Sequence, residues 1–520
     1  MLALTSILLA MATASRAGNI STSFSKHDPV ADQIELFKEK YADPIGIMTT
    51  SSGAPISYSD ATNSLNSVLT NNDYFIDSLT HFNRERIPER VVHDKGGGAF
   101  GYFEVTQDIH DICKAEMLSK IGKKTPVAVR FSSLTPEKGG SDVLREARGF
   151  AVKFYTKDGN FDIVGLNIPI FTIKDPLKFP NFAHAVKRNP STNLRDSKTF
   201  WDFTTLNPES FFHLLFQFGD RGIPASYVNM PGFSIHTYQV ENEHGEKHFV
   251  RFHFIPDAGI KNLTTEEARK IAAEDLDYFN RILYRAIANG EFPSWTVSVQ
   301  VLTMKDVKKS RYDVFDVTRL ISLKKHPLKE VGKLILDKNP KNFFAEIEQL
   351  AFCPGNLVPG ILGDPSKFFE ARRFLYKDAQ NYRLGANFNK ISVNCPYRTK
   401  TLTYNRDGAA PVKDNGGDIS NYYPNSFNGP VPYTNTHKSG LISIVENPEP
   451  NNFEQATELY VNEITSDERS RLVTNIVSTL KLSTVVTQTR AVDIFKRIHP
   501  DLGRRVAQGL KENHMLLDSV

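Results

Sequence analysis

The residues with the clearest capacity for chemistry lie between Arg372 and Arg383. In an α-helix, Arg372 and Tyr376 are four residues apart and share a face, to which Arg383 returns after seven more residues. A phenol ionises at about pH 10 in water, whereas a nearby guanidinium or a bound ferric ion favours the phenolate. The segment could therefore give an anionic oxygen ligand to iron. Taken alone, the pattern is more typical of an amphipathic helix whose Tyr and Arg pack at a surface.

The elements that would position this helix are expected to be mainly strands. In Thr125–Ser132, apolar residues such as Val127 and Phe131 alternate with residues that point to the other face. Turn signals at Lys157–Asn160 and Glu243–Glu246 separate runs of this kind, which indicates an antiparallel sheet or barrel. The other β-rich runs are Gly149–Thr156, Phe161–Ile173, Phe233–Val240, Lys247–Ile255 and Trp295–Thr303.

Helices interrupt the strands and close the chain. Thr264 and Glu267 form a capping-box pattern before a segment that runs to about residue 288, and Thr465 and Glu468 form another. Residues 18–80 read mainly as an extended polar arm. Between residues 400 and 450 the periodicity is lost and Asn, Pro and Gly accumulate, which is typical of a connection that wraps over a neighbouring surface.

The bulk composition excludes several classes of protein. The chain has 520 residues, and its 63 basic and 59 acidic residues leave a net charge of only +4, so we expect no nucleic-acid partner. The three cysteines, Cys113, Cys353 and Cys395, form no CxxC pair, which makes a disulfide scaffold unexpected.

The N-terminus reads as a candidate targeting segment. Leu2–Ala14 is apolar, ends in small residues and is too short to span a bilayer, so we expect no membrane span. This pattern favours a secretory signal peptide over residues 1–17, although a basic n-region is absent. A Ser/Thr-rich stretch without acidic residues before Asp28 also suits a mitochondrial presequence. A peroxisomal or cytoplasmic location stays open, although the C-terminus is not the usual peroxisomal signal.

Several motifs occur together along the chain and change the interpretation of the Arg372–Tyr376 segment. With these motifs the chain resembles the haem catalases, collinearly from about Asp28 to His499. The motifs are Arg84-Glu-Arg-Ile-Pro-Glu-Arg-Val-Val-His-Asp-Lys-Gly-Gly-Gly-Ala-Phe-Gly101, Arg130-Phe-Ser132, Arg148-Gly-Phe-Ala-Val-Lys-Phe-Tyr155, Arg372-Arg-Phe-Leu-Tyr376 and Val393-Asn-Cys-Pro-Tyr397.

The resemblance assigns roles to individual residues. It implies that Tyr376 ligates the iron of haem b, that Arg372 stabilises the tyrosinate, and that His93 faces the iron from the distal side. His93 would move a proton between the two oxygens of hydrogen peroxide, which is converted to water and oxygen. The other implied haem contacts are a hydroxyl that orients His93 (Ser132), arginines for the haem carboxylates (Arg90, Arg130 and Arg383) and apolar pocket residues (Val92, Phe179 and Phe352).

One distal residue departs from the family pattern. The family places a catalytic asparagine directly after the glycine of this motif, but here the run is Val164-Gly-Leu-Asn167. Aligned without a gap, Leu166 takes the catalytic position and cannot donate a hydrogen bond to peroxide. Asn167 is then the candidate catalytic amide only if a local bulge returns it to the pocket, because neighbouring residues of a strand point to opposite faces.

Two other regions also depart from the family. His236 matches a histidine that supports the proximal arginine, but the aspartate expected beyond it is Ser366. On the surface that binds NADPH in many animal relatives, Arg221 and Phe216 are kept. The expected histidine, lysine and histidine are replaced there, so we predict that NADPH binding is poor or lost; the replacements are Phe212, Ile255 and Leu323.

Two remaining motifs are read as structural. His244-Gly-Glu-Lys-His248 is expected to be a hairpin turn and not a metal site, because it lacks the H-E-x-x-H pattern. Gly96-Gly-Gly98 lacks the lysine of a phosphate loop and is interpreted as flexibility beside His93.

The sequence thus predicts an α+β protein with an antiparallel β-barrel. The resemblance implies that the barrel has eight strands and that the protein is a homotetramer. The expected parts are a signal peptide (1–17), an N-terminal arm (18–80), a haem-binding barrel (81–399), a wrapping connection (400–450) and a helical domain (451–520). The preferred function is a catalase with reduced turnover. The alternatives are a non-catalytic haem-binding protein of the same fold and an enzyme that rearranges fatty-acid hydroperoxides.

Overall fold

The computed structural model describes residues 28–58, 72–410, 412–433 and 451–517. The predicted signal peptide and the start of the predicted arm lie outside the described residues, so they stay predictions. The chain forms two compact units, Met1–Phe75 and Ile76–Val520. In the described part of the first unit, α2 (Gln33–Lys40) contains no buried residue. None of the helices in the described ranges is long and apolar enough to cross a bilayer.

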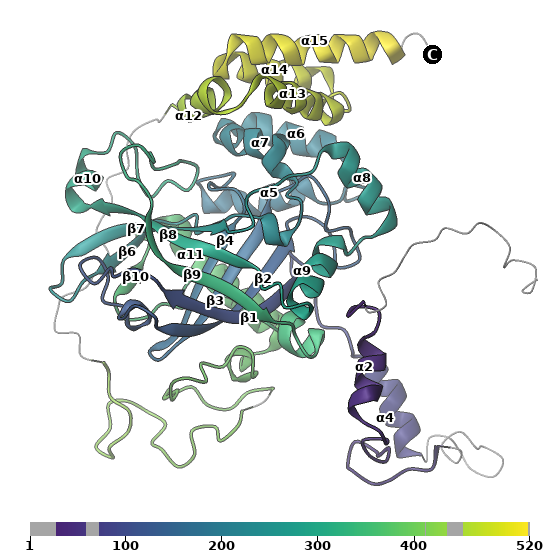
Figure 1. Cartoon of the computed structure of the whole chain (residues 1–520), viewed down its shortest axis with the longest axis vertical. Helices are drawn as coiled ribbons and strands as arrows, with labels where there is room; N and C mark the ends of the chain where they lie inside the picture. Colours follow the sequence, from purple (N-terminus) through teal and green to yellow (C-terminus); the bar gives the residue numbers. More distant parts are fainter. Residues whose placement is uncertain (1–27, 59–71, 411, 434–450, 518–520) are drawn as a thin grey trace, which may run out of the picture. The chain divides into compact units, whose positions relative to one another are not determined.

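The second unit is built around a closed antiparallel barrel. Its strands pair in the cyclic order β1–β2–β3–β4–β5–β7–β8–β9 and back to β1. Figure 1 shows this barrel below the helices of the same unit. Two short strands extend this sheet: β6 (Tyr238–Glu241) pairs with β7, and β10 (Ile361–Gly363) pairs with β6. The barrel strands are β1 (Gly96–Val105), β2 (Lys124–Ser133), β3 (Arg148–Thr156), β4 (Gly159–Leu166), β5 (Gly232–Phe233), β7 (Lys247–Pro256), β8 (Ser294–Thr303) and β9 (Lys329–Lys338).

Alternation along the strands separates the barrel interior from its outer face. Phe131 on β2, Phe150 on β3 and Trp295 on β8 pack together, with ring centroids 5.0 Å apart for Phe131–Phe150 and 5.7 Å apart for Phe150–Trp295. These residues belong to a core to which all the long barrel strands contribute. The residues that alternate with these inward-pointing ones along each strand point outward. On β2 these are Ala128, Arg130 and Ser132, three residues of small or polar character, which are also buried.

The predicted strands are mostly confirmed, with two corrections of length. The run Phe161–Ile173 leaves the sheet at Leu166, and the run Phe233–Val240 is divided into β5 and β6. Two barrel strands were not among the predicted runs. β9 is interrupted by lysines and a glycine, and β1 begins with the Gly96–Gly98 run.

The flexible interpretation of the glycine run was wrong. A Cβ on Gly96 would overlap the backbone oxygen of Phe131, and one on Gly97 would overlap the side chain of Asn280. The glycines are therefore needed for close approach of β1 to its neighbours, not for mobility.

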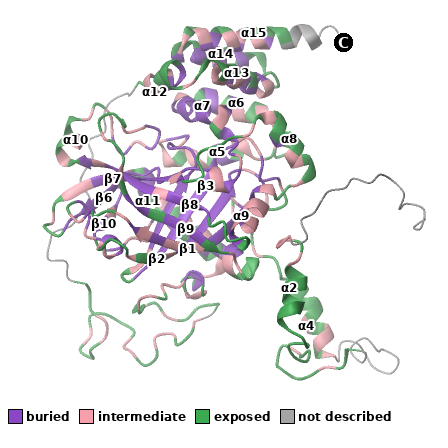
Figure 2. Ribbon diagram, viewed as in Figure 1, coloured by how far each residue is buried: buried purple, intermediate pink, exposed green. Residues whose placement is uncertain are grey.

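Helices form a second core beside the barrel. α6 (Ser197–Leu206) and α7 (Phe211–Phe218) pack against the C-terminal helices, and α5 (Phe179–Val186) packs on α6. Trp201 Nε1 on α6 donates to Thr479 Oγ1 at 3.1 Å across the contact with the C-terminal helices (Figure 1). Figure 2 shows that the buried residues concentrate in the barrel and along this helical layer. The C-terminal helices are α12 (Glu454–Glu458), α13 (Ser466–Leu480), α14 (Val485–Ile498) and α15 (Pro500–Leu517).

Both predicted capping boxes are confirmed. Thr264 accepts from the Glu267 amide at the start of α8 (Thr265–Glu274), and Thr465 does the same for Glu468 at α13. The first helix is shorter than predicted, because α8 ends at Glu274. A separate helix, α9, begins at Tyr278 and ends at Ala288. The described residues between 400 and 433 contain no helix or strand.

The barrel makes a prediction about Gly101, where β1 meets β9. A Cβ there would overlap the backbone carbonyl of Ile335, which belongs to the partner strand and cannot move alone. We expect Gly101→Ala to lower the free energy of unfolding by about 3 kcal/mol. Gly139→Ala is the matched control, because nothing lies within 4 Å of the position that its Cβ would take, and it should change stability by less than about 0.5 kcal/mol. Equal urea midpoints for both variants would contradict this account of the strand pairing.

Candidate functional site

The proximal side is formed by α11 (Lys367–Leu384). Arg372 Nη2 donates to Tyr376 Oη at 3.1 Å and to the carbonyl of Val164 at 2.9 Å. The predicted shared face of Arg372 and Tyr376 is therefore confirmed. Tyr376 is half-buried against an apolar cluster that includes Ala151 and Phe352 on the outer face of the barrel. α11 thus presents a phenol oxygen that accepts a hydrogen bond from a guanidinium. A phenol oxygen in this setting is a suitable ligand for a ferric ion.

The carboxylate partner of His236 corrects one sequence-based expectation. Ser366 was expected to leave His236 without its carboxylate, but Asp364 supplies one from two residues earlier. Its Oδ2 lies 3.1 Å from His236 Nδ1, and both side chains are fully buried. Ser366 instead caps α11 through its hydroxyl, which accepts from the Phe369 amide. The signal in the sequence was the Asp-Pro-Ser order at 364–366, which a residue-by-residue match overlooks.

The distal side is organised around His93. Its backbone has φ of +65°, in the left-handed region that costs a side chain such as histidine on the order of 1 kcal/mol or more. Ser132 Oγ lies 3.0 Å from His93 Nδ1, as the resemblance implied. Burial, followed by the charges of Arg130, Arg372 and Arg90, lowers the pKa of His93 to about 3. The imidazole is therefore neutral at physiological pH and can accept a proton.

The strand register places Leu166 on the same face as His93. Ser132 on β2 pairs with Gly149 on β3, Gly149 pairs with Leu166 on β4, and cross-strand partners point to one face. A Cβ on Gly149 would lie 3.0 Å from His93 Nδ1 and would overlap Ser132 Oγ, so this face carries the imidazole. Leu166 is buried in the apolar cluster that includes Val92, Phe171 and Phe179.

Asn167 does not share this face, which corrects its candidacy as the catalytic amide. Its Oδ1 accepts from the backbone amide of Arg148 at 2.7 Å, and its Nδ2 donates to the carbonyl of Arg221 at 3.4 Å. No bulge precedes it, because β4 pairs in unbroken register with β3 from Gly159 to Leu166. The structure brings together the predicted His93 and Ser132 and places Leu166, not an amide, beside them.

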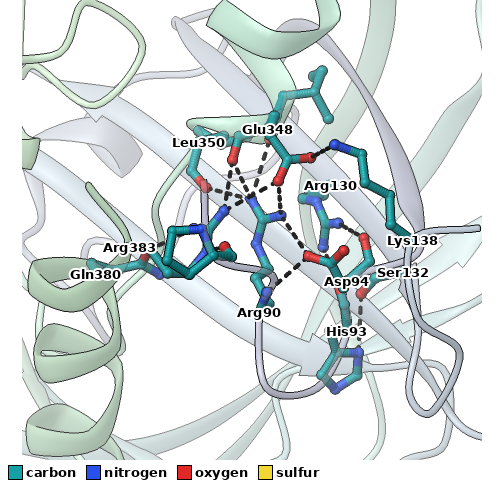
Figure 3. Close-up of polar contacts among 12 residues, drawn as sticks. Arg90, His93, Asp94, Arg130, Ser132, Lys138, Glu348, Leu350, Gln380 and Arg383 are labelled. Atoms are coloured by element: carbon teal, nitrogen blue, oxygen red, sulfur yellow. Dashed lines mark hydrogen bonds and ion pairs between the residues drawn. The ribbon is translucent and has the colours of Figure 1, made fainter. Parts of the chain in front are cut away.

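Three predicted arginines converge at one end of the site, as Figure 3 shows. Arg130 donates through both Nη atoms to the carbonyls of His93 and Asp94, each at 2.7 Å. Arg90 donates to the carbonyl of Glu348 at 2.8 Å, and Arg383 donates to the same oxygen at 3.0 Å. The predicted cluster is therefore present, and it carries two acidic residues that the sequence analysis did not single out.

The charges of this cluster fit the carboxylates of haem. The buried guanidiniums of Arg130 and Arg383 and the mostly buried guanidinium of Arg90 face the two buried carboxylates of Asp94 and Glu348, so one positive charge is left over. Arg90 Nη1 and Arg130 Nε are buried without a hydrogen-bond partner. Burial and the neighbouring guanidiniums lower the pKa of Arg90. An added anion would relieve all three features, and Tyr376 would supply the iron ligand on the same barrel face.

Two further regions bear on the sequence analysis. On the surface matched to NADPH binding, the Arg221 guanidinium lies 5.4 Å from the centre of the Phe216 ring, Phe212 is buried and Leu323 is exposed. The prediction of poor NADPH binding stays a prediction. The predicted hairpin turn lies at residues 242–246 between β6 and β7, and His248 already belongs to β7. No cluster of three metal-binding side chains occurs in the described part of the chain.

Fold and site define a class of protein: an antiparallel β-barrel whose outer face combines a tyrosine–arginine pair, a neutral histidine and an arginine cluster. Comparison with known proteins agrees with this class. The Catalase family model matches residues 49–429, and a second model, Catalase-related immune-responsive, matches residues 446–510. The chain belongs to the catalase family.

Individual relatives cover nearly the whole chain. The chain is 45% identical to a catalase of Drosophila melanogaster over 494 residues (93% of this chain and 98% of the relative) and 45% identical to a catalase of Sus scrofa over 490 residues (92% and 93%). Among solved structures, catalase A from Saccharomyces cerevisiae superposes with a TM-score of 0.84 at 42% identity, covering 89% of this chain and 99% of that one.

The Asp364 finding can be tested against Ser366. We expect Asp364→Asn to lower activity or haem retention by about 10-fold, because it removes the charged partner of the buried His236, which feels the charge of Arg372. The haem absorption spectrum of the loaded protein should change with it. Ser366→Ala should cost about 1 kcal/mol of stability through the lost cap and leave the spectrum unchanged. A spectrum that responds to Ser366→Ala and not to Asp364→Asn would return the supporting role to position 366.

The buried histidines predict acid sensitivity. Burial lowers the pKa of His213 to about 3 and that of His253 to about 4, against an ordinary value of 6.5. Between pH 6.5 and these lowered pKa values, the two histidines bind more protons in the unfolded chain than in the folded one. The stability of the fold must therefore decrease as the pH falls below about 6.5. We expect the urea midpoint to decrease from pH 7 to pH 5, and His213→Gln to reduce that decrease. An unchanged pH slope in the variant would mean that His213 is protonated in the folded protein.

Proposed function

We propose that this chain is a haem b-dependent catalase that converts hydrogen peroxide to water and oxygen more slowly than its relatives. The observation that carries the proposal is the pairing, on one barrel face, of Tyr376 held by Arg372 with a neutral His93 held by Ser132. The relatives at about 45% identity are named catalases and are covered almost completely.

The chain's own residues divide the work. Bound haem would supply a ferric ion that takes peroxide and exchanges two electrons with it. Arg372 donates a hydrogen bond to the Tyr376 oxygen, which would hold that ion. The neutral imidazole of His93 would accept a proton from one peroxide oxygen and return it to the other, so that water can leave. Ser132 fixes the ring through Nδ1, which leaves Nε2 for the proton.

The expected loss of rate follows from Leu166. This side chain lies on the His93 face, where a hydrogen-bond donor to peroxide would stand, and it can only exclude water. By analogy with loss of one preorganised donor, the cost is about 10² in rate, or about 3 kcal/mol. His93 still provides proton transfer, so the proposal is weakened turnover and not its absence.

The two alternatives have unequal support. Leu166 and Ser366 are the two departures that favour a non-catalytic haem-binding protein, but Asp364 supplies the carboxylate partner of His236 that Ser366 cannot. Leu166 alone still favours that alternative. The alternative that rearranges fatty-acid hydroperoxides needs a pocket for a long chain, and the contacts of Leu166 with its apolar neighbours do not by themselves provide one.

The experiment compares the natural protein with Leu166→Asn. We expect measurable oxygen release from hydrogen peroxide, rising by about 10² in the variant because the amide adds the missing donor. Haem content is measured in both from the absorption spectrum. Full haem content with no oxygen release from either protein would support the non-catalytic alternative. Consumption of a lipid hydroperoxide without oxygen release would support the rearranging enzyme. A homotetramer, as the resemblance implies, stays a prediction.

A further inference from the structure

Asp94 is a buried acidic residue that the proposed reaction does not use. It directly follows His93 and is 4% exposed. Its Oδ1 accepts from the backbone amide of Arg90 at 2.8 Å and lies 3.7 Å from Arg90 Nη1. Its Oδ2 is buried and has no hydrogen-bond partner. Figure 3 shows Asp94 between His93 and the Arg90 and Arg130 side chains.

The carboxylate halves the excess charge of the arginine cluster. With the carboxylates of Asp94 and Glu348 together, the three guanidiniums leave one excess positive charge, whereas with Glu348 alone they would leave two. Glu348 is itself shared, because Lys138 Nζ approaches its Oε2 at 3.4 Å from a half-exposed position. Asp94 is therefore the acidic group that most directly opposes a further anion at Arg90.

The arginines are already held by the chain itself. Arg90 Nη2 donates to the backbone carbonyls of Glu348 and Leu350 at 2.8 and 3.0 Å, and Arg130 to those of His93 and Asp94. A haem carboxylate would find Arg90 Nη1 free of hydrogen bonds but within 3.7 Å of two protein carboxylates. It would gain a guanidinium and, at the same time, approach the negative charge of Asp94, whose Oδ1 lies 3.7 Å from Arg90 Nη1.

We propose that Asp94 is a positioning residue that sets how tightly haem is held. Its carboxylate orients Arg90 while it repels the haem carboxylates, so the chain holds its arginines in place without haem and releases haem more readily than a chain with a neutral residue at this position. The repulsion acts across a buried site, where water and salt screen it little.

Asp94→Asn separates the charge from the structural role. Its amide oxygen can still accept from the Arg90 backbone, while its NH₂ group replaces the unpartnered oxygen by a donor. We expect haem to leave the variant at least about tenfold more slowly, measured as transfer to excess apomyoglobin by absorbance. Asp111→Asn makes the same change of charge at an exposed residue and should leave the rate unchanged.

Esterified haem identifies the interaction responsible. Both proteins are loaded with the dimethyl ester of iron protoporphyrin IX, which lacks the carboxylate charges. The difference between the natural protein and Asp94→Asn should then disappear. The proposal is overturned if Asp94→Asn releases ordinary haem as fast as the natural protein or faster, or if its slower release persists with the ester. Oxygen release is not measured, so the result is independent of the catalytic rate.

Discussion

The two-residue alternation of side chains in β2, β3 and β4 is the constraint on which the rest of the structure depends. Phe131 on β2 and Phe150 on β3 point into the barrel and help to fill it. The residues next to them along each strand must therefore point outward. Closure of the sheet fixes the register of every strand, because each barrel strand is paired on both sides and cannot slip alone. The row Ser132–Gly149–Leu166 is therefore held on the outer face as firmly as the core is held inside.

That outer face has a strongly graded polarity. In one part, three guanidiniums lie with the buried carboxylates of Asp94 and Glu348, and in another Tyr376 packs against an apolar cluster. His93 is kept neutral by burial and by the positive charges of Arg130, Arg372 and Arg90. Groups that would be costly to bury singly are stable here because backbone carbonyls accept most of their hydrogen bonds. A planar cofactor with an apolar body and a charged edge matches this gradient.

The departures from the family occur where the chain has rearranged its polar groups. The proximal carboxylate is kept but moved, from position 366 to Asp364, and His236 remains paired. The distal donor is not replaced in the same way, since Asn167 is committed to the backbone of Arg148 and Arg221. The proximal carboxylate is therefore preserved within the Asp-Pro-Ser turn, whereas the distal hydrogen-bond donor is lost at Leu166.

Sequence alone determined the motifs, the helix that unites Arg372 with Tyr376, most barrel strands and both capping boxes, because these depend on spacing within a few residues. It failed for the start of β1, where the glycines at 96–98 that are needed for close packing looked like a flexible loop, and for Asp364, whose role depends on a partner 128 positions away. Only the tertiary structure decided to which side of the sheet Asn167 points, and that Asp94 and Glu348 lie beside the three arginines and offset part of their charge. Those outcomes depend on strand register and on burial, which arise when distant segments pack together.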